Sequence, residues 1–182
     1  MDSASPWRRH FFAFAPGDDA RFALANLSLP AGARRVAAPD LHATLAFLDT
    51  LDVEGERRAA FTAKQVAERA GDRMTVSLAL FERWSSSWVV CDDGRDDNVD
   101  LERLARALHA ALREAGFAIE GRPFRAHVTV ARQRGDAVRP MPARLAAPIR
   151  FAATELLLMA SPAVVPAESP RYVLRARLPL RL

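Results

Sequence analysis

The chain has 182 residues, of which 50% are hydrophobic and 26% are charged. This balance predicts one folded domain over residues 1–182 and excludes a disordered chain. The formal net charge is +4, and Lys64 is the only lysine among 26 basic residues, so arginine carries almost all of the positive charge. Cys91 is the only cysteine, which excludes an internal disulfide framework and a zinc cluster built on cysteine.

Two features bear on where the protein is located. The apolar run from Phe11 to Ala15 is too short for the hydrophobic part of a secretory signal, and Pro16 and Gly17 end it. No stretch approaches the roughly 18 apolar residues that a membrane span needs. The sequence therefore predicts a soluble, cytoplasmic protein that does not bind a membrane, and we expect a monomer.

The first half of the chain combines strands with two helices. In chain order we expect a strand at residues 8–15, a helix at 18–27, a loop at 34–40, a strand at 41–48 and a helix at 53–70. On the second helix, Phe61, Val66 and Ala67 are expected to face inward, and Gly71 is expected to end it.

The second half contains more strands and the clearest helix. In chain order we expect strands at residues 74–81 and 88–91, an acidic turn at 92–97, a helix at 99–115, a strand at 127–132, a loop at 136–148, and strands at 151–159 and 172–178. The helix carries a leucine stripe, at Leu101, Leu104, Leu108 and Leu112. Three prolines predict the loop, and the last two strands are expected to form an antiparallel pair.

The order of these elements predicts the fold class. Hairpins are mixed with helices, and strand and helix do not alternate strictly, which favours an α+β fold. A faint internal repeat is also present, because a helix, a turn with proline and a strand that starts with His-x-Thr occur at residues 17–45 and again at 99–130. Two similar halves that face each other would bring both His-x-Thr strands to one cleft.

The two His-x-Thr motifs are the strongest candidates for chemistry. His42 and Thr44 form the first motif, and His127 and Thr129 form the second. Residues two apart on a strand point to the same side, so each motif presents an imidazole beside a hydroxyl. Imidazole titrates near neutral pH, so one ring can take a proton while the other gives one. The two hydroxyls can hydrogen-bond phosphoryl oxygens.

Arginine surrounds the second motif. Residues 121–150 hold seven arginines against Asp136 alone, a balance that attracts a polyanion. Arg125 and Arg132 flank the motif, and we expect both to bind substrate. Arg132 lies five residues after His127, so a regular strand turns it to the opposite face and a bulge or the strand end is needed to bring it round.

Other residues have both a functional and a structural interpretation. Phe12 and Phe124 are candidates for stacking on a base, although aromatic residues on strands usually belong to the core. His10 at a strand edge and His109 beside the leucine stripe are expected to be structural. The acidic turn at residues 92–97 does not match a calcium-binding loop and is expected to be solvated.

Around these motifs the sequence resembles the two-histidine (2H) phosphoesterase superfamily. Within it, the resemblance is to the RNA 2′,3′-cyclic phosphodiesterases, which are also called 2′-5′ RNA ligases. It runs over nearly the full length and rests on RHFFA at residues 9–13, PDLHATLAFL at 39–48, LHAAL at 108–112, RPFRAHVTVAR at 122–132 and PRY at 170–172. Val130 and Ala126 replace the commoner leucine and proline of the family.

The resemblance implies a bilobal α+β fold, with two pseudo-symmetric lobes of antiparallel sheet and outer helices around a central cleft. It implies His42 as proton donor, His127 as proton acceptor, and Thr44 and Thr129 on the phosphate, with no metal and no other cofactor. The implied activity is hydrolysis of a 2′,3′-cyclic phosphate, at an RNA end or on a nucleoside, to a 2′-phosphomonoester. Some members of the family also join or cut 2′-5′ RNA linkages.

Two other functions stay open at this point. One is a module that binds RNA or a nucleotide without turnover, although such a module does not need two groups that transfer protons. The other is a phosphodiesterase that acts on 2′-5′ oligonucleotides or on a small cyclic phosphate. Rates on a mononucleotide and on an RNA with a cyclic end separate the enzymatic alternatives.

Overall fold

The computed structural model describes residues 5–134, 141–164 and 170–181. Its strands are β1 (Trp7–Phe14), β2 (Arg34–Arg35), β3 (Ala43–Leu48), β4 (Met74–Trp84), β5 (Ser87–Cys91), β6 (His127–Arg132), β7 (Ala143–Ala153), β8 (Glu155–Pro162) and β9 (Val173–Pro179). Its helices are α1 (Asp18–Ala25), α2 (Val53–Ala67) and α3 (Val99–Glu114), with short 3₁₀ helices η1 (Ala38–Asp40) and η2 (Asp96–Asn98).

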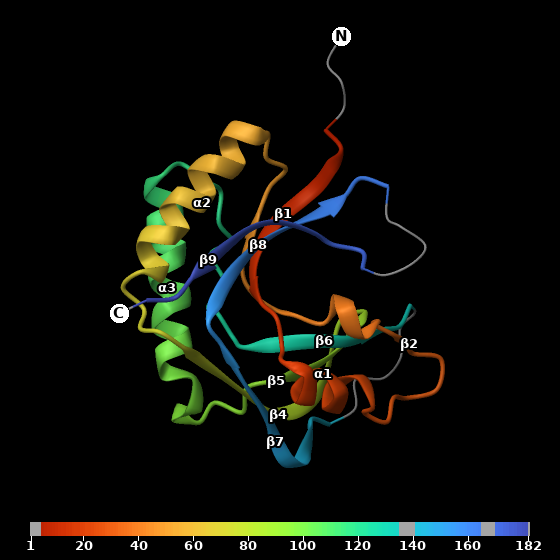
Figure 1. Ribbon diagram of the computed structural model, residues 1–182. Helices are drawn as coiled ribbons and strands as arrows, with labels where there is room; N and C mark the ends of the chain where they lie inside the picture. Colours follow the sequence, from red (N-terminus) through yellow and green to blue (C-terminus); the bar gives the residue numbers. More distant parts are fainter. Residues whose placement is uncertain (1–4, 135–140, 165–169, 182) are drawn as a thin grey trace.

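The strands form one antiparallel sheet with two halves, which confirms the α+β class (Figure 1). Along the sheet the order is β7-β4-β5-β6-β3-β1-β8-β9, and β2 pairs with β6 outside this order. Within each half, neighbouring strands pair over several residues. The halves join where β3 pairs with β6, and the register there consists of one pair, Ala43 with Val128. This junction places the two His-x-Thr strands side by side.

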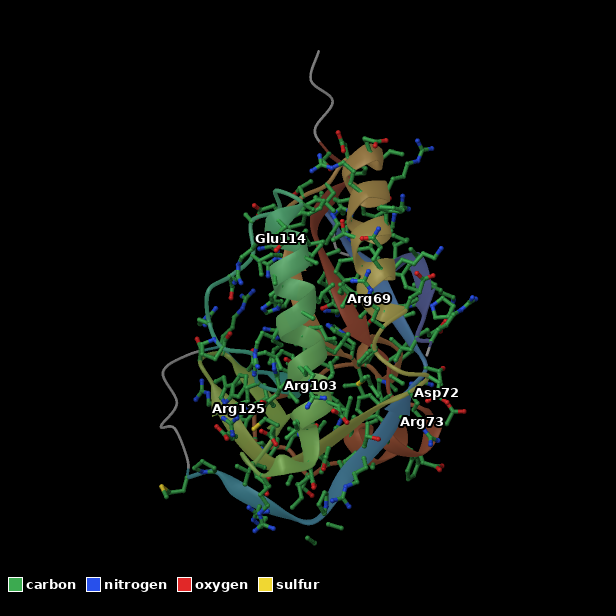
Figure 2. All side chains as sticks on the ribbon, turned by 90° about the vertical axis from the view of Figure 1, so that its left-hand side faces the viewer. Arg69, Asp72, Arg73, Arg103, Glu114 and Arg125 are labelled. Atoms are coloured by element: carbon green, nitrogen blue, oxygen red, sulfur yellow. The ribbon has the colours of Figure 1, made fainter. Side chains whose placement is uncertain are left out.

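Helices α2 and α3 lie next to each other on one side of the sheet (Figure 1), and Figure 2 looks directly onto them. The leucine stripe of α3 is confirmed, because all four of its leucines are buried. Burial stabilises the fold by about 1.5–3 kcal/mol for each such side chain. Gly116 has a φ of 85° and follows α3 in the left-handed conformation that ends many helices. Among the described helices, none has the length and apolar character needed to cross a membrane.

The inner face of α2 differs from the prediction. Its buried apolar residues are Ala59, Ala63 and Ala67, which recur every four residues and so lie on one face. Phe61 is two residues from Ala59, which turns it by about 200° around the helix axis, and it is 65% exposed. The expectation that Phe61 faces inward is wrong, because a row of small alanines, and not the largest side chain, makes the contact.

The strands after β6 also differ from the prediction. Residues 136–140 lie outside the described residues, but Ala143–Ala153 form β7 where a loop was expected. Pro148 is tolerated because β7 is an edge strand whose register with β4 shifts beside it. The strand expected at residues 151–159 is divided at Thr154 between β7 and β8. The antiparallel pairing of the last two strands, β8 and β9, is confirmed.

Candidate active site

A β-bulge interrupts β3 directly after the first His-x-Thr motif. Thr44 pairs with Ala13 of β1 and Ala46 pairs with Phe12, so Leu45 is an extra residue in the ladder. A bulge of this kind reverses the alternation of the side chains beyond it. Ala46, two residues after Thr44, is therefore buried in the core instead of sharing the face of the motif, and Phe47 continues that face.

The same irregularity occurs in β6, directly after the second motif. Thr129 pairs with Val89 of β5 and Ala131 pairs with Trp88, so Val130 is the extra residue. The bulge that Arg132 needed in order to reach the face of the motif is thus present, and Arg132 lies on the wall of the same cavity as Thr129.

The two motifs meet at the junction of the halves. Ala43 and Val128 are opposite each other in an antiparallel pair and are both buried. Continuing this register by one residue in each direction sets the histidine of each motif beside the threonine of the other. Side chains alternate along a strand, so these four polar side chains lie on the face opposite to that of Ala43 and Val128.

All four polar side chains line one cavity of about 900 Å³. Its wall also contains seven arginines, namely Arg8, Arg9, Arg34, Arg35, Arg132, Arg134 and Arg171. Among the described lining residues, Asp40 is the only acidic one. An excess of guanidinium groups of this size makes the cavity attractive to an anionic ligand.

Hydrogen bonds determine which nitrogen of each histidine is available. His42 Nδ1 lies 2.7 Å from the carbonyl oxygen of Asp40, and His127 Nδ1 lies 2.9 Å from that of Arg125. A carbonyl only accepts, so in both rings Nδ1 carries the hydrogen and donates it. Nε2 is then the basic nitrogen in the neutral form of both rings. Both imidazoles can therefore exchange a proton with a ligand through Nε2.

Burial lowers the pKa of both imidazoles. The pKa of His42 falls to about 4, chiefly because burial disfavours the charged ring, and the charges of His127 and Arg132 lower it further. The pKa of His127 is also lowered by burial, and then by the charges of Arg125 and Arg132. In the free protein both rings are therefore neutral at pH 7, and an anion bound between them would favour protonation.

Aromatic rings hold His42 from two sides. The ring of Phe11 in β1 is stacked on the imidazole with 4.9 Å between ring centres. The ring of Tyr172, just before β9, meets it edge-on at 5.0 Å. Phe11 and Tyr172 are also in edge-on contact with each other. The segment that leads into β9 thus contributes to the wall of the first motif.

A different set of residues supports His127. The ring centre of Trp84, at the end of β4, lies 4.7 Å from that of the imidazole. Trp84 donates its Nε1–H to Glu82 at 2.8 Å. Glu82 also accepts a hydrogen bond of 2.7 Å from Arg125. The wall behind His127 is therefore an ionic and aromatic cluster.

Three predicted substrate-binding residues do not line the cavity. Phe12 is 0% exposed in the core, because the alternation of β1 turns Phe12 toward the core and Phe11 toward His42. Phe124 packs against the hydrophobic core. Arg125, on the segment that leads into β6 (Figure 2), is held behind His127 by Glu82. These three residues therefore lie away from the wall of this cavity, whereas Arg132 lines it.

Sequence reasoning missed several cavity residues. Phe47 lines the cavity and is 37% exposed, and the guanidinium carbon of Arg9 lies 5.1 Å from its ring centre. The two-residue spacing of Arg9 and Phe11 on β1 predicts that these residues share a face, but not that this face lines the cavity. Phe47 gave no such signal, because its orientation depends on the bulge before it.

The other two histidines have structural partners, as expected. His10 is fully buried and accepts the N–H of Leu51 at Nδ1. Its Nε2 therefore carries the hydrogen and donates it to Glu56 at 2.9 Å. His109 of α3 contacts the carbonyl oxygen of Leu45 through Nε2 at 2.7 Å. Neither histidine lines the cavity.

The acidic turn differs from the solvated turn that was expected. Asp92 is buried and accepts a hydrogen bond from Asn98. Asp93 pairs with Arg144, and Asp97 pairs with Arg150 of β7. In the part of the chain that the structure describes, no group of three or more histidine, cysteine or acidic residues is arranged to hold a metal ion.

Comparisons with known proteins agree with this architecture. A family model of LigT-like phosphoesterases matches residues 96–166. The RNA 2′,3′-cyclic phosphodiesterase of Escherichia coli (strain K12) is 32% identical over 132 residues, which are 72% of this chain and 72% of the relative.

Solved structures show the same fold. A crystal structure described as a phosphoesterase has a TM-score of 0.75 and 27% identity, covering 97% of this chain and 99% of that one. The crystal structure of E. coli LigT in apo form has a TM-score of 0.72 and 30% identity, covering 98% and 100%. For E. coli LigT complexed with 3′-AMP, the TM-score is 0.70 and the identity 27%, with 96% and 98% covered.

Proposed function

The chain belongs to the LigT-like phosphoesterase family, and from this premise we propose that it hydrolyses 2′,3′-cyclic phosphates to 2′-phosphomonoesters. The observation that carries the proposal is the pair of imidazoles in one arginine-rich cavity, both with Nδ1 bonded to a backbone carbonyl. A relative is named for this activity on RNA, which supports RNA ends, or nucleosides that carry the same cyclic phosphate, as substrates.

In the proposed reaction, the two rings transfer protons in opposite directions. Nε2 of His127 takes a proton from water while the water oxygen attacks phosphorus. Nε2–H of His42 gives its proton to the 3′ oxygen while the bond between phosphorus and that oxygen breaks. The products are a 2′-phosphomonoester and a 3′-hydroxyl, and water is the only other reactant. A second proton transfer between the rings and solvent restores the enzyme.

The remaining cavity residues have roles in holding the phosphate. The hydroxyls of Thr44 and Thr129 suit hydrogen bonds to its two non-bridging oxygens. Arg132, which the bulge in β6 brings to the cavity face, suits the negative charge that grows in the transition state. The exposed ring of Phe47 with Arg9 over it offers a flat surface to a base.

This division of work assigns acid, base and charge stabilisation to protein side chains, so the proposed reaction is metal-independent. A 2′-5′ linkage presents the same phosphate diester to the same groups. Cutting or joining 2′-5′ RNA is therefore a further activity to be examined on this site, and binding without turnover is the outcome in which no product forms.

The experiment is incubation of the purified protein with 2′,3′-cyclic AMP in excess EDTA, followed by phosphorus NMR. We expect 2′-AMP as the product. A 3′-phosphomonoester would reverse the assignment of the leaving oxygen, and activity that EDTA abolishes would contradict metal independence. If neither the cyclic nucleotide nor an RNA with a cyclic end gives a product, the site binds without turnover.

A further inference from the structure

The two cavity histidines have equivalent backbone contacts but opposite charges behind them. Each ring donates its Nδ1–H to the carbonyl of the residue two places earlier in the chain. That residue is Asp40 for His42 and Arg125 for His127. The two hydrogen bonds are alike, whereas the side chains of the residues that accept them carry charges of opposite sign.

The carboxylate of Asp40 is held in place beside His42. Asp40 is buried, and its Oδ1 accepts the main-chain N–H of Arg171 at 2.6 Å. The guanidinium of Arg171 is farther away, with Nε 4.0 Å from Oδ2. A fixed carboxylate favours an imidazolium ring near it, and the charge of Asp40 acts to raise the pKa of His42.

The guanidinium of Arg125 is held behind His127 by two hydrogen bonds. Its Nη2 donates to Glu82 and to the carbonyl oxygen of Asp92, both at 2.7 Å. Its carbon Cζ lies 5.4 Å from the ring centre of Trp84, which in turn contacts His127. A fixed cation disfavours a second positive charge near it, and the charge of Arg125 lowers the pKa of His127.

Other charged and titratable groups also face the two rings. Around His42 they are His127, Arg132, Arg171 and Tyr172. Around His127 they are Arg132, His42 on the same cavity wall, Cys91 opposite it on β5 and, bonded to Arg125, Glu82. Burial raises the pKa of Tyr172 and of Cys91, so both remain neutral. Arg132 lowers the pKa of both histidines, so it does not distinguish them.

We propose that Asp40 and Arg125 are positioning residues that divide the two proton-transfer roles, with Asp40 stabilising an imidazolium at His42 and Arg125 keeping His127 neutral. This inference rests on the proposed function, because it concerns the same two rings. A phosphate diester between the rings places its negative charge near both and displaces water from both. Burial is the largest influence on both rings in the free protein, and once a diester lies between them the opposite charges behind the rings favour the proton on His42, which then acts as the acid.

The test is an NMR titration of the imidazoles in protein saturated with sulfate, a phosphate-like anion whose own charge is constant above pH 4. We expect His42 to hold its proton to a higher pH than His127. Asp40→Asn should lower the pKa of His42, and Arg125→Gln should raise that of His127, whereas Arg125→Lys keeps the charge and should restore the wild-type order. Asp100→Asn and Arg103→Gln, in an exposed ion pair of α3, are matched controls that should change neither value.

Kinetics on 2′,3′-cyclic AMP give a second readout. D40N should lower kcat roughly tenfold at pH 8, where the acid needs its proton, with a smaller loss at pH 6. R125Q should do the reverse, with the larger loss at pH 6. A role in folding alone would lower both ends of the pH range together. If D40N does not fold, R125Q and R125K still test the inference, because the charge behind His127 alone should then set how far that ring resists protonation.

The outcomes separate this inference from the proposed function. Titrations that move as expected in a protein that forms no product would contradict the proposed function and support the division of charge. Product formation by the wild type, with pKa values that do not move or that move in the same direction in D40N and R125Q, would overturn the inference alone. A His127 that holds its proton to higher pH than His42 would also overturn it.

Discussion

The strands β3 and β6 hold the same motif in the same bulged backbone, yet different elements support each bulge. In β3 the carbonyl of the extra residue, Leu45, is bonded to the ring of His109 from α3 at 2.7 Å. In β6 the carbonyl of the extra residue, Val130, accepts the main-chain N–H of Val36 at 2.8 Å. A bulge withdraws a carbonyl from its ladder and that group then needs a partner. The two halves therefore share the bulged backbone geometry, whereas the groups that bond the carbonyl of each extra residue differ.

The two halves also differ inside the cavity, at the position five residues after each motif histidine. It is Phe47 in the first strand and Arg132 in the second, and both line the cavity because both follow a bulge. One position presents an aromatic surface and the other a positive charge. A cavity built from two similar halves can therefore bind an asymmetric ligand in one orientation.

The largest effect is expected from removing either imidazole. His42→Ala and His127→Ala should each lower kcat on 2′,3′-cyclic AMP by about 10² to 10⁴, because each removes one of two proton transfers. Circular dichroism and Tm check that the fold persists, and His10 and His109 are absent from the cavity wall, so they do not replace the lost ring. Near-full activity in either variant would show that the two motifs do not share the chemistry.

The next largest effect separates Arg132 from Phe47. Arg132→Ala should lower kcat/KM roughly 10²-fold on 2′,3′-cyclic AMP and equally on glycerol 1,2-cyclic phosphate, which has no base. Phe47→Ala should raise KM about tenfold for the nucleotide alone, because stacking requires a base. Equal losses on both substrates in F47A would contradict an aromatic surface that contacts the base.

The two bulge supports give a matched pair of variants. His109→Leu removes the ring from the Leu45 carbonyl, and Val36→Pro removes the N–H from the Val130 carbonyl. Each leaves a carbonyl without its partner, which costs about 1–3 kcal/mol where the group is buried, so both should lower Tm. H109L disturbs β3 and should therefore lower kcat/KM more on 2′,3′-cyclic AMP, which has a base, than on glycerol 1,2-cyclic phosphate. V36P disturbs β6 and should lower kcat/KM on both substrates, as loss of Arg132 does. A lower Tm with no change in kcat/KM on either substrate would show that the supports of the bulges do not affect the cavity.

The smallest expected effect is the number of protons that the protein takes up when an anion binds. The pKa values of His42 and His127 lie below their ordinary value in the free protein, so at pH 6 each ring holds fewer protons than an unperturbed imidazole would. A bound anion raises both values, and the sign of the change is therefore proton uptake. Calorimetry of sulfate binding in buffers of different ionisation enthalpy measures it. Uptake should disappear in the H42A/H127A double variant, and proton release in the wild type would contradict the electrostatics of the cavity.

Local patterns predicted much of this structure. The strand at residues 127–132 and the leucine stripe of α3 follow from alternation and from the helical period, which depend on neighbouring residues only. The repeat of the His-x-Thr strands predicted two similar halves that share one cleft. The four motif residues line one cavity for the same reason.

What could not be predicted depends on contacts between distant segments. Alternation on β1 separates Phe11 from Phe12 but does not say which one faces the cavity, because that depends on the strands on either side. The bulges after Thr44 and Thr129 follow from pairing with β1 and β5. The outward turn of Phe61 follows from the small residues of α2 that face the core. These outcomes belong to tertiary packing and have no local signal.

The most direct test of two similar strands performing opposite proton transfers is the pH dependence of kcat for the wild type, H42A and H127A on 2′,3′-cyclic AMP. The account predicts a bell-shaped profile for the wild type, with one limb for the loss of the base and one for the loss of the acid. H42A should lose the limb at high pH and H127A the limb at low pH. A wild-type profile that is flat between about pH 5 and 9, or two variants that lose the same limb, would contradict the account.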